Sequence, residues 1–417
     1  MVDLSINCGG IQSPNPFWLA SGPPTNSGDQ VMRAFDAGWG GAVWKTLGQP
    51  IRNVYSRYGG VDYAGRRLMG LNNIELITDR PLEVNLKEIK EVKKRYPQHA
   101  VIASMMFGPK EEWKEWIHKV EDTGADGLEL NFGCPHGMCE RGMGSAVGQE
   151  PRVLEEITSW VMEFSSIPVL VKLTPNITDI TEPGLAAQRG GANGVSLINT
   201  IQSLVGVDLD KFVPYPKVDG KSTPGGYCGP AVKPIALQMV AKLAAHPDFH
   251  LPISGIGGVS SWRDAAEFIA LGAASVQVCT AAMHYGFRIV EDMLEGLKNY
   301  MEEKGFQSIE DFRGKAVANY TSWGELNLNY KIRAKIDENR CTGCQLCYIA
   351  CRDGVYDCID LPRNGSRIPI ISERCIGCNL CSLICPEYCI TMEEIPTGKG
   401  YMSWNQYIQQ GGDKQDQ

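Results

Sequence analysis

The sequence lacks any long apolar run, since no stretch of its 417 residues approaches the ~18–20 apolar residues needed to span a bilayer. Its start, MVDLSINCGG, also lacks the basic residues and apolar core of a secretory signal. Basic residues are also outnumbered, because the chain has 40 Lys and Arg but 48 Asp and Glu, which gives a net charge of −8. General nucleic-acid binding needs a basic surface. We therefore expect neither a membrane nor a nucleic acid as a partner.

A second absence concerns nucleotide binding. No predicted strand is followed by the G-x-G-x-x-G fingerprint that opens a dinucleotide-binding fold. The absence argues against a doubly wound dinucleotide domain and against an NAD(P) site in this chain. If the protein uses electrons from a nicotinamide cofactor, another polypeptide must bind that cofactor and pass the electrons on.

Disulfides are not expected, although cysteine is abundant. The total of 15 is odd, and ten cysteines follow residue 340 while five precede it. The C-terminal ones form tight C-x2-C groups, which are typical of metal or cofactor ligands in a reducing compartment. We therefore predict a cytoplasmic protein with a cysteine-dense C-terminal module.

Eight short apolar runs alternate with amphipathic segments between residue 16 and about residue 297. The runs are 16–22, 42–46, 100–106, 127–134, 168–175, 194–200, 252–258 and 275–280. Helical patterns lie between several of them, for example at 111–124, 151–164 and 261–272. Eight buried strands that each precede a helix predict an α/β fold, the (β/α)8 barrel.

Four regions follow from these patterns. We expect the barrel at residues 1–300, a linker with a peripheral helix at 301–335, the cysteine-rich module at 336–396 and a polar tail at 397–417. Within the barrel, two connections at 47–85 and 201–232 are long and rich in Gly, Pro, Asn and Tyr. Long loops at the carboxyl ends of barrel strands commonly cover the active site.

The pattern C-x2-C-x2-C-x3-C occurs twice in the C-terminal module. The first run consists of Cys341, Cys344, Cys347 and Cys351, and the second of Cys375, Cys378, Cys381 and Cys385. In ferredoxins with two clusters, the fourth cysteine of each run binds the other cluster. We therefore predict two [4Fe–4S] clusters, with Cys385 assigned to the first run and Cys351 to the second. Two structural zinc sites are the alternative, although zinc usually takes separated C-x2-C pairs. Cys358 and Cys389 fall outside the spacing and are expected to be buried apolar residues.

Polar residues and glycines recur where the predicted strands end, the place where barrels carry their chemistry. GIGG and the following Cys-Thr pair come after the last two strands, where backbone N–H groups commonly bind phosphate. Lys45 and Lys172 lie within apolar runs, and a buried lysine is costly without a partner. The anionic edge of a reduced flavin would supply that partner; otherwise both lysines reach solvent at the barrel mouth. We predict a bound FMN at these strand ends, whose residues include Ala20, Ser21, Lys45, Thr46, Lys172, Gly257, Gly258, Cys279 and Thr280.

The segment NFGCPHGMCERGMG (131–144) follows the fourth strand and holds two cysteines, a histidine and four glycines. It is open to three interpretations: a zinc site made of Cys134, His136 and Cys139, a reactive-thiol loop, or a glycine-rich turn. Spacing alone is weak evidence for zinc. Our hypothesis is a lid that closes over a substrate and carries the thiol.

Taken together, these motifs resemble the dihydropyrimidine dehydrogenase family. The matching segments are FWLASGPPTNS, LNNIELIT, NFGCPHGMCERGMG, VKLTPN, LINT, GYCGPAVKPIAL, GIGG and the ferredoxin pattern. The resemblance covers about residues 5–395 and implies reduction of the 5,6-bond of uracil and thymine with FMN. It also implies a partner subunit with FAD, an NAD(P)H site and further iron–sulfur clusters, in a heterotetramer.

The resemblance further implies roles for single residues. Cys134 would protonate C5 of the pyrimidine after hydride reaches C6 from flavin N5, a step that suits a thiol because it is protonated near neutrality and can still donate. The residues implied to bind the pyrimidine are Asn73, Glu75, Asn131, His136, Asn199 and Thr200. Two residues depart from the animal enzyme: Gly133 replaces a serine and Cys139 replaces a glycine, which leaves the substrate preference open.

Two other functions remain open on the sequence. A dihydroorotate dehydrogenase-type flavoenzyme shares the barrel, but it recognises a carboxylate and normally has no fused ferredoxin module. An electron-transfer subunit with an inactive barrel is the other. The full set of polar strand ends argues against an inactive barrel.

Overall fold

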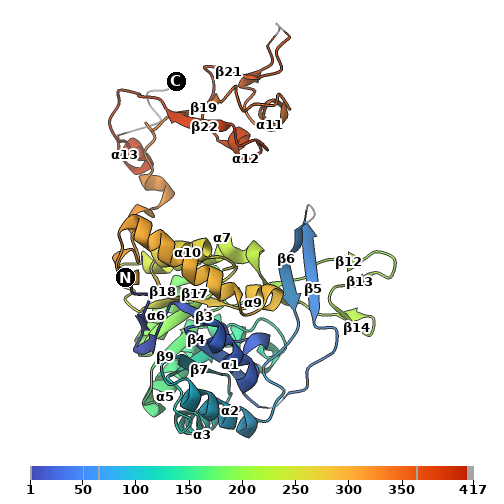
Figure 1. The fold of residues 1–417 in the computed structure, drawn as a ribbon, viewed down its shortest axis with the longest axis vertical. Helices are drawn as coiled ribbons and strands as arrows, with labels where there is room; N and C mark the ends of the chain where they lie inside the picture. The colour runs from blue at the N-terminus through green and yellow to red at the C-terminus, as the bar shows by residue number, and fades with distance from the viewer. Residues whose placement is uncertain (1, 50, 64–65, 363–364, 411–417) are drawn as a thin grey trace. The chain divides into compact units, whose positions relative to one another are not determined.

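The structure is a computed structural model that describes residues 2–49, 51–63, 66–362 and 365–410. The chain divides into two compact units, the first ending at Tyr320 and the second beginning at Thr321 (Figure 1). Among the described residues, no helix combines the length and the apolar character needed to cross a bilayer.

A closed barrel of eight parallel strands forms the core of the first unit, as predicted. In chain order the strands are β3 (Phe17–Leu19), β4 (Gly41–Leu47), β7 (Ala100–Met105), β8 (Gly127–Asn131), β9 (Val169–Lys172), β10 (Gly194–Leu197), β17 (Ile253–Ile256) and β18 (Ala273–Val278). Six of the strands fall within one of the eight apolar runs of the sequence, while β4 extends one residue beyond its run at each end and β18 begins two residues before its run. The ring closes where β18 pairs with β3, with Val278 opposite Leu19.

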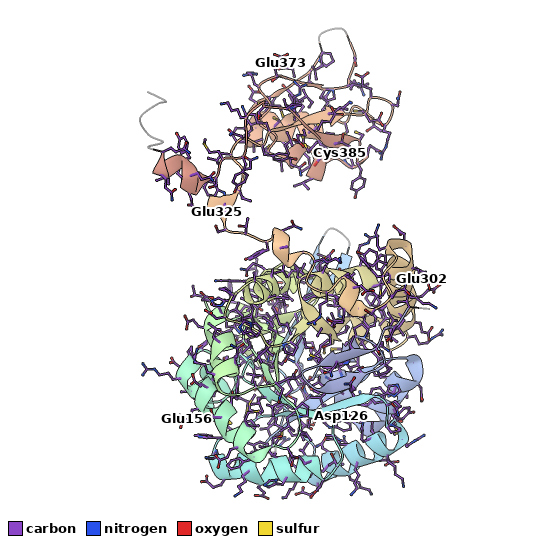
Figure 2. The ribbon with its side chains drawn as sticks, turned by 90° about the vertical axis from the view of Figure 1, so that its left-hand side faces the viewer. Asp126, Glu156, Glu302, Glu325, Glu373 and Cys385 are labelled. Carbon is purple, nitrogen blue, oxygen red and sulfur yellow. The ribbon has the colours of Figure 1, made fainter. Side chains whose placement is uncertain are left out.

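Helices surround the barrel and present their apolar faces to it. They are α1 (Gly28–Ala37), α2 (Leu82–Arg95), α3 (Lys110–Glu121), α5 (Pro151–Phe164), α6 (Thr181–Arg189), α7 (Lys233–Ala244), α8 (Trp262–Ala270) and α10 (Ile289–Lys304). In α5, Leu154 and Val161 are fully buried, and each such side chain contributes roughly 1.5–3 kcal/mol by leaving water. Glu156 on α5 and Glu302 on α10 point away from the core (Figure 2). The side chain of Ser261 accepts the N–H of Asp264 and so caps α8 at its predicted start.

The two ends of the barrel differ. At the amino ends of the strands, β1 (Ile6–Cys8) and β2 (Ile11–Ser13) form a hairpin. At the carboxyl ends, short helices follow two strands: α4 (Ser145–Gly148) and α9 (Thr280–Tyr285). The 3-10 turns of the first unit are η1 (Pro23–Thr25), η2 (Cys139–Arg141), η3 (Pro230–Val232), η4 (Ile309–Asp311) and η5 (Val317–Asn319).

The two long connections join into one sheet, a feature that the sequence did not predict. From the first come β5 (Tyr58–Tyr63) and β6 (Arg66–Asn73), and from the second come β11 (Ile201–Ser203) and β16 (Gly225–Cys228), paired in the order β11-β16-β6-β5. Two small hairpins extend the second connection: β12 (Val207–Asp208) with β13 (Val213–Pro214), and β14 (Lys217–Val218) with β15 (Lys221–Ser222). Figure 1 shows β5, β6 and these hairpins on the same side of the barrel.

The second unit is built on two short antiparallel ladders. β19 (Ile332–Ile336) pairs with β22 (Ile390–Glu394), and β20 (Ile359–Asp360) pairs with β21 (Ile370–Ile371). α11 (Leu346–Gly354) and α12 (Leu380–Leu383) carry cysteines of the two runs. The unit also contains η6 (Trp323–Glu325) and α13 (Trp404–Gln409).

The unit boundary falls inside the segment expected as a linker, 301–335. Ile309 and Phe312 are buried in the core of the first unit, because the first part of this segment still carries apolar residues that pack on the barrel. In the polar tail, the Trp404 ring lies 5.8 Å from the Trp323 ring, and Ser403 caps α13. Residues 411–417 of that tail lie outside the described residues.

Candidate functional site

A cavity of about 1220 Å³, part of it open to solvent, lies at the carboxyl ends of the barrel strands. All sixteen residues predicted from the sequence to bind the cofactor, bind the substrate or donate the proton line this cavity. They are Ala20, Ser21, Lys45, Thr46, Asn73, Glu75, Asn131, Cys134, His136, Lys172, Asn199, Thr200, Gly257, Gly258, Cys279 and Thr280. The topology therefore brings together residues that are up to 260 positions apart in the chain.

The glycines after β16 and β17 form one wall of the cavity. Gly257 and Gly258 have φ values of +128° and +74°, which favour glycine. A β-carbon on Gly258 would lie 2.9 Å from the carbonyl oxygen of Gly229, so a side chain is excluded. Thr280 opens α9 beside them. A bare backbone next to a helix start fits the phosphate of a mononucleotide.

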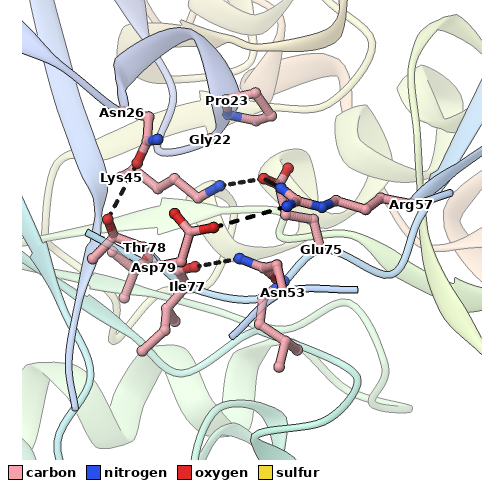
Figure 3. A network of polar contacts seen from close by, with 12 residues as sticks. Gly22, Pro23, Asn26, Lys45, Asn53, Arg57, Glu75, Ile77, Thr78 and Asp79 are labelled. Carbon is pink, nitrogen blue, oxygen red and sulfur yellow. Dashed lines mark hydrogen bonds and ion pairs between the residues drawn. The ribbon is translucent and has the colours of Figure 1, made fainter. Parts of the chain in front are cut away.

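Lys45 pairs with Glu75, and this pair joins β4 to the segment that follows β6. The Lys45 Nζ atom donates to Glu75 Oε1 at 2.5 Å, and Arg57 Nη1 donates to the same oxygen at 2.9 Å. Figure 3 shows the two cations approaching Glu75 from opposite sides, with Arg57 also reaching Asp79 at 3.8 Å. Tyr58 donates its hydroxyl to Glu75 Oε2 at 2.6 Å. Glu75 therefore has three protein partners on two oxygens.

These partners determine the ionisation states of Glu75 and Tyr58. Burial by itself raises the pKa of Glu75, but Lys45, Tyr58 and Arg57 outweigh burial and hold that pKa below its ordinary value. The pKa of Tyr58 is raised, first by burial and then by the adjacent Glu75 carboxylate. Glu75 is thus ionised at neutral pH and Tyr58 keeps its proton.

Lys172 pairs with a second carboxylate, Glu129, inside the barrel. The two charged atoms, Lys172 Nζ and Glu129 Oε1, lie 3.3 Å apart. Lys45 and Lys172 are each 4% exposed, so neither reaches solvent at the mouth. The sequence reasoning considered a flavin or solvent as the partner of these lysines, whereas in the structure a protein carboxylate faces each of them. A flavin would meet two ion pairs instead of two unpaired cations.

A chain of side-chain hydrogen bonds crosses the cavity floor. Ser21 Oγ lies 3.2 Å from Thr46 Oγ1, and Thr46 accepts from Asn131 Nδ2 at 2.9 Å. The Asn131 carbonyl accepts from Asn199 Nδ2 at 3.0 Å, and Asn199 Oδ1 accepts the backbone N–H of Thr200 at 2.8 Å. The chain fixes the orientation of both amides and leaves each side-chain NH2 with a second proton for a ligand.

The position of Asn199 explains sterically why residue 133 is a glycine. A β-carbon at Gly133 would lie 2.4 Å from Asn199 Cβ and 2.5 Å from Asn199 Nδ2. The backbone N–H of Gly133 donates to Asn131 Oδ1 at 3.3 Å. The missing side chain therefore allows Asn199 to approach Asn131.

The Cys134 thiol is buried at the cavity and hydrogen-bonds within its own loop. Its Sγ atom lies 3.5 Å from the carbonyl oxygen of His136. His136 is held in turn by a contact of 3.2 Å between its Nε2 atom and the carbonyl oxygen of Glu75, while its buried Nδ1 atom has no hydrogen-bond partner. Burial lowers the pKa of His136, so the ring is neutral at neutral pH. The Cys139 side chain lies outside the described residues, and among the described ones no three His, Cys, Asp or Glu side chains are placed to share one metal ion.

Several lining residues were missed by the sequence reasoning. They include Tyr58, Tyr227, Cys228, Gln277 and His284 on the wall, and Glu129 beneath it. Glu129 and Gln277 carried the same signal as the lysines, a polar residue inside an apolar strand run. Tyr58 and Tyr227 gave no such sequence signal, because they belong to the sheet that was not predicted. Burial raises the pKa of Cys228 to about 11 and that of Cys279 to about 12, so both thiols stay protonated.

The cysteines of the second unit line two separate cavities. One is lined by Cys341, Cys344, Cys347, Cys385 and Cys389, and the other by Cys351, Cys358, Cys375, Cys378 and Cys381. Cys358 and Cys389 are buried, each 4% exposed. Apart from Cys389 and Cys358, each cavity contains the four cysteines that the sequence prediction assigns to one [4Fe–4S] cluster.

Comparisons with known proteins agree with both units. The dihydroorotate dehydrogenase family model matches residues 3–301, and a 4Fe-4S dicluster domain model matches residues 334–392. The NAD-dependent dihydropyrimidine dehydrogenase subunit PreA of Escherichia coli K12 is 42% identical over 95% of this chain and 97% of its own length. The chloroplastic dihydropyrimidine dehydrogenase (NADP(+)) of Arabidopsis thaliana is 45% identical over 78% of this chain and 79% of its own. The catalytic subunit of dihydroorotate dehydrogenase B (NAD(+)) from Pyrococcus horikoshii is 38% identical over 75% and 98%.

Fold, cavity and cysteine module define a class: an oxidoreductase that joins a flavin-type barrel to an iron–sulfur module. Within that class, the chain belongs to the dihydropyrimidine dehydrogenase family.

Proposed function

We propose that this chain reduces the 5,6-double bond of uracil and thymine to the dihydropyrimidines. The observation that carries the proposal is one cavity that combines a buried thiol, a row of oriented amides and a bare glycine wall. Uracil presents alternating carbonyl and N–H groups along its edge. The side chains of Asn73, Asn131 and Asn199 supply matching donors and acceptors. Glu75 and His136 also line the cavity and complete the proposed substrate contacts with Thr200.

FMN is the proposed cofactor, with its phosphate at Gly257, Gly258 and Thr280 and its ring beside the two lysine–carboxylate pairs. When bound, it supplies the hydride that is added to C6 of the pyrimidine. Cys134 holds the proton that goes to C5, and the His136 carbonyl orients its thiol. Asn131 and Asn199, which orient each other, would hold the pyrimidine through their side-chain amides.

We place two [4Fe–4S] clusters in the second unit and a partner subunit beyond them, in the cytoplasm. The partner would carry FAD, an NAD(P)H site and further clusters, and the two kinds of subunit would form a heterotetramer. Support comes from the absence of a dinucleotide fingerprint in this sequence. The printed name of the Escherichia coli relative, a subunit of an NAD-dependent enzyme, agrees with this division.

An orotate-specific enzyme is less well supported by the cavity. A carboxylate substrate needs a cation that is not already engaged. The described lining residues include no arginine, and both lysines face protein carboxylates.

The test is stopped-flow reoxidation of the photoreduced holoenzyme by uracil, thymine and orotate. We expect fast reoxidation by uracil and thymine and slow reoxidation by orotate. A fast response to orotate alone would overturn the proposal. A preparation that binds no flavin after reconstitution would instead support an inactive barrel.

A further inference from the structure

We propose that Glu129 is a positioning residue that offsets the charge of Lys172 and thereby lowers the reduction potential of the bound flavin. The inference rests on the proposed function in one respect, namely that a flavin occupies the cavity. It concerns Glu129, which lies beneath the cavity and is not one of its lining residues.

Glu129 and Lys172 are neighbours on the inner face of the barrel. Glu129 lies on β8 two residues before Asn131, and Asn131 is in register with Lys172 on β9. Glu129 is completely buried, and its Oε1 atom lies 3.3 Å from Lys172 Nζ. That oxygen accepts no hydrogen bond among the described residues, so Lys172 is the group that faces it.

The other carboxylate oxygen is fixed by neutral donors. Ser196 Oγ donates to Glu129 Oε2 at 2.7 Å, and Gln277 Nε2 donates to it at 2.9 Å. Gln277 is itself held by Ser254 at 3.1 Å, and Ser254 accepts from Ser275 at 2.7 Å. These contacts come from three further strands, so the carboxylate cannot turn away from Lys172.

The second lysine–carboxylate pair has a different charge balance. Glu75 meets two cations, Lys45 and Arg57, and lies on a segment outside the barrel. Glu129 meets one cation and lies on a barrel strand. Loss of the Glu129 charge would therefore leave Lys172 as a buried cation without a counter-charge, next to the cavity that Lys172 lines.

The electrostatic consequence has a definite sign. Reduction places negative charge on the flavin ring, and a buried negative charge nearby opposes it more strongly than it would in water. Lys172 favours the reduced form, and Glu129 cancels part of that effect. A lower potential makes the reduced flavin a stronger hydride donor toward the pyrimidine.

The test compares Glu129→Gln with Ser196→Ala in the full-length holoenzyme. Glu129→Gln removes the charge of the buried carboxylate. Ser196→Ala removes only a neutral hydrogen-bond donor to that carboxylate. We expect the flavin midpoint potential, measured by anaerobic spectroelectrochemistry, to rise in Glu129→Gln and to stay near the wild-type value in Ser196→Ala. The dissociation constant of the flavin–sulfite adduct, which positive charge near the ring stabilises, should fall in Glu129→Gln on the order of tenfold.

A double variant keeps the inference testable if Glu129→Gln does not fold, because neutralising both members of a buried pair is better tolerated than removing one. We expect the potential of Glu129→Gln/Lys172→Gln to lie above that of Lys172→Gln and near that of the wild type. An unchanged or lower potential on loss of Glu129, or an equal rise in Ser196→Ala, would overturn the inference. Absence of flavin from the wild-type protein would overturn the proposed function itself, and this one with it.

Discussion

At the scale of single residues, the cavity combines groups that are held in place before any ligand arrives. Cys134 and His136 hydrogen-bond within one loop, and Asn131 and Asn199 fix each other. Side chains that are already oriented lose little entropy when a substrate binds. Changes at these positions should therefore affect binding and chemistry more than folding.

Replacement of Cys134 by alanine tests the proton donor. We expect Cys134→Ala to lower the turnover of uracil by at least about a hundredfold, because general acid catalysis contributes roughly 10²–10⁴-fold. The absorption spectra of flavin and clusters should stay unchanged. Cys228→Ala, which removes another thiol of the cavity wall, is the matched control and should retain most of the rate. Turnover near the wild-type rate in Cys134→Ala would remove this thiol from the mechanism.

A side chain at position 133 tests the packing of Asn199. Gly133→Ala should raise the KM for uracil by roughly 5- to 150-fold, since a displaced hydrogen-bonding group costs about 1–3 kcal/mol. Gly108→Ala is the control, because Gly108 is exposed and a β-carbon there meets nothing within 4 Å. The two KM values, compared with the flavin content of each variant, check the prediction. Equal KM values would show that Asn199 tolerates the extra carbon.

His136 should make stability depend on pH. Its pKa in the folded protein lies below the ordinary value of 6.5, so the unfolded chain binds the proton first as the pH falls. Stability is therefore present above pH 6.5 and is lost as the pH falls toward the folded pKa. His99 and His284 act in the same direction, because burial lowers their pKa values too.

The measurement is urea unfolding at pH 7.5 and at several values below 6.5. We expect a smaller loss of stability on acidification in His136→Gln than in the wild type. His250→Gln, at an exposed position, should keep the wild-type dependence. If His136→Gln loses as much stability on acidification as the wild type does, the prediction is contradicted.

At the scale of elements, the sheet β11-β16-β6-β5 shapes the cavity but is separate from the barrel. Asn72 fastens it, because its buried amide donates to the backbone oxygen and to Oγ of Ser203, at 3.0 and 2.8 Å. Tyr58, Asn73 and Tyr227 reach the cavity from its strands. The stability of this sheet should therefore be adjustable without loss of the barrel.

Asn72→Ala tests that separation. We expect hydrogen-exchange protection to fall in β6 and β11 while the barrel strands keep theirs, since the lost bonds lie outside the barrel. Asn7→Ala is the control, because Asn7 accepts from Gly10 in the hairpin at the other end of the barrel. Loss of protection throughout the first unit would show that sheet and barrel unfold together.

The sequence predicted the barrel well and this sheet not at all, for a physical reason. Strands buried on both faces carry continuous apolar runs, as in VLVK of β9, and such runs are visible without a structure. β5, β6 and β16 are rich in Gly, Asn and Arg, and their pairing is set by contacts that are distant in the chain. The cavity residues at strand ends were therefore predictable. The partners of Lys45 and Lys172 were not, because pairing depends on which side chains meet in the folded barrel.

At the scale of the whole molecule, pairs of cysteine substitutions test the interleaved clusters. Cys341→Ser/Cys385→Ser removes two ligands of one proposed cluster, and we expect about four irons per chain to remain. Cys341→Ser/Cys351→Ser removes two ligands from the same sequence run. It should disturb both clusters and leave fewer irons. Iron analysis with EPR of the dithionite-reduced proteins checks the prediction, and the opposite ranking would show that each run binds its own cluster.

The division of each ligand set between two distant runs also has a consequence during synthesis. Cys341, Cys344 and Cys347 leave the ribosome together, but the cavity that they line is completed by Cys385, near the end of the chain. Likewise, Cys351 is synthesised before Cys375, Cys378 and Cys381, with which it lines the other cavity. At ~5–20 residues per second, the delay lasts a few seconds. A chain that stops before Cys375 would complete neither set, so acquisition of iron would act as a check that translation has reached the end of the module.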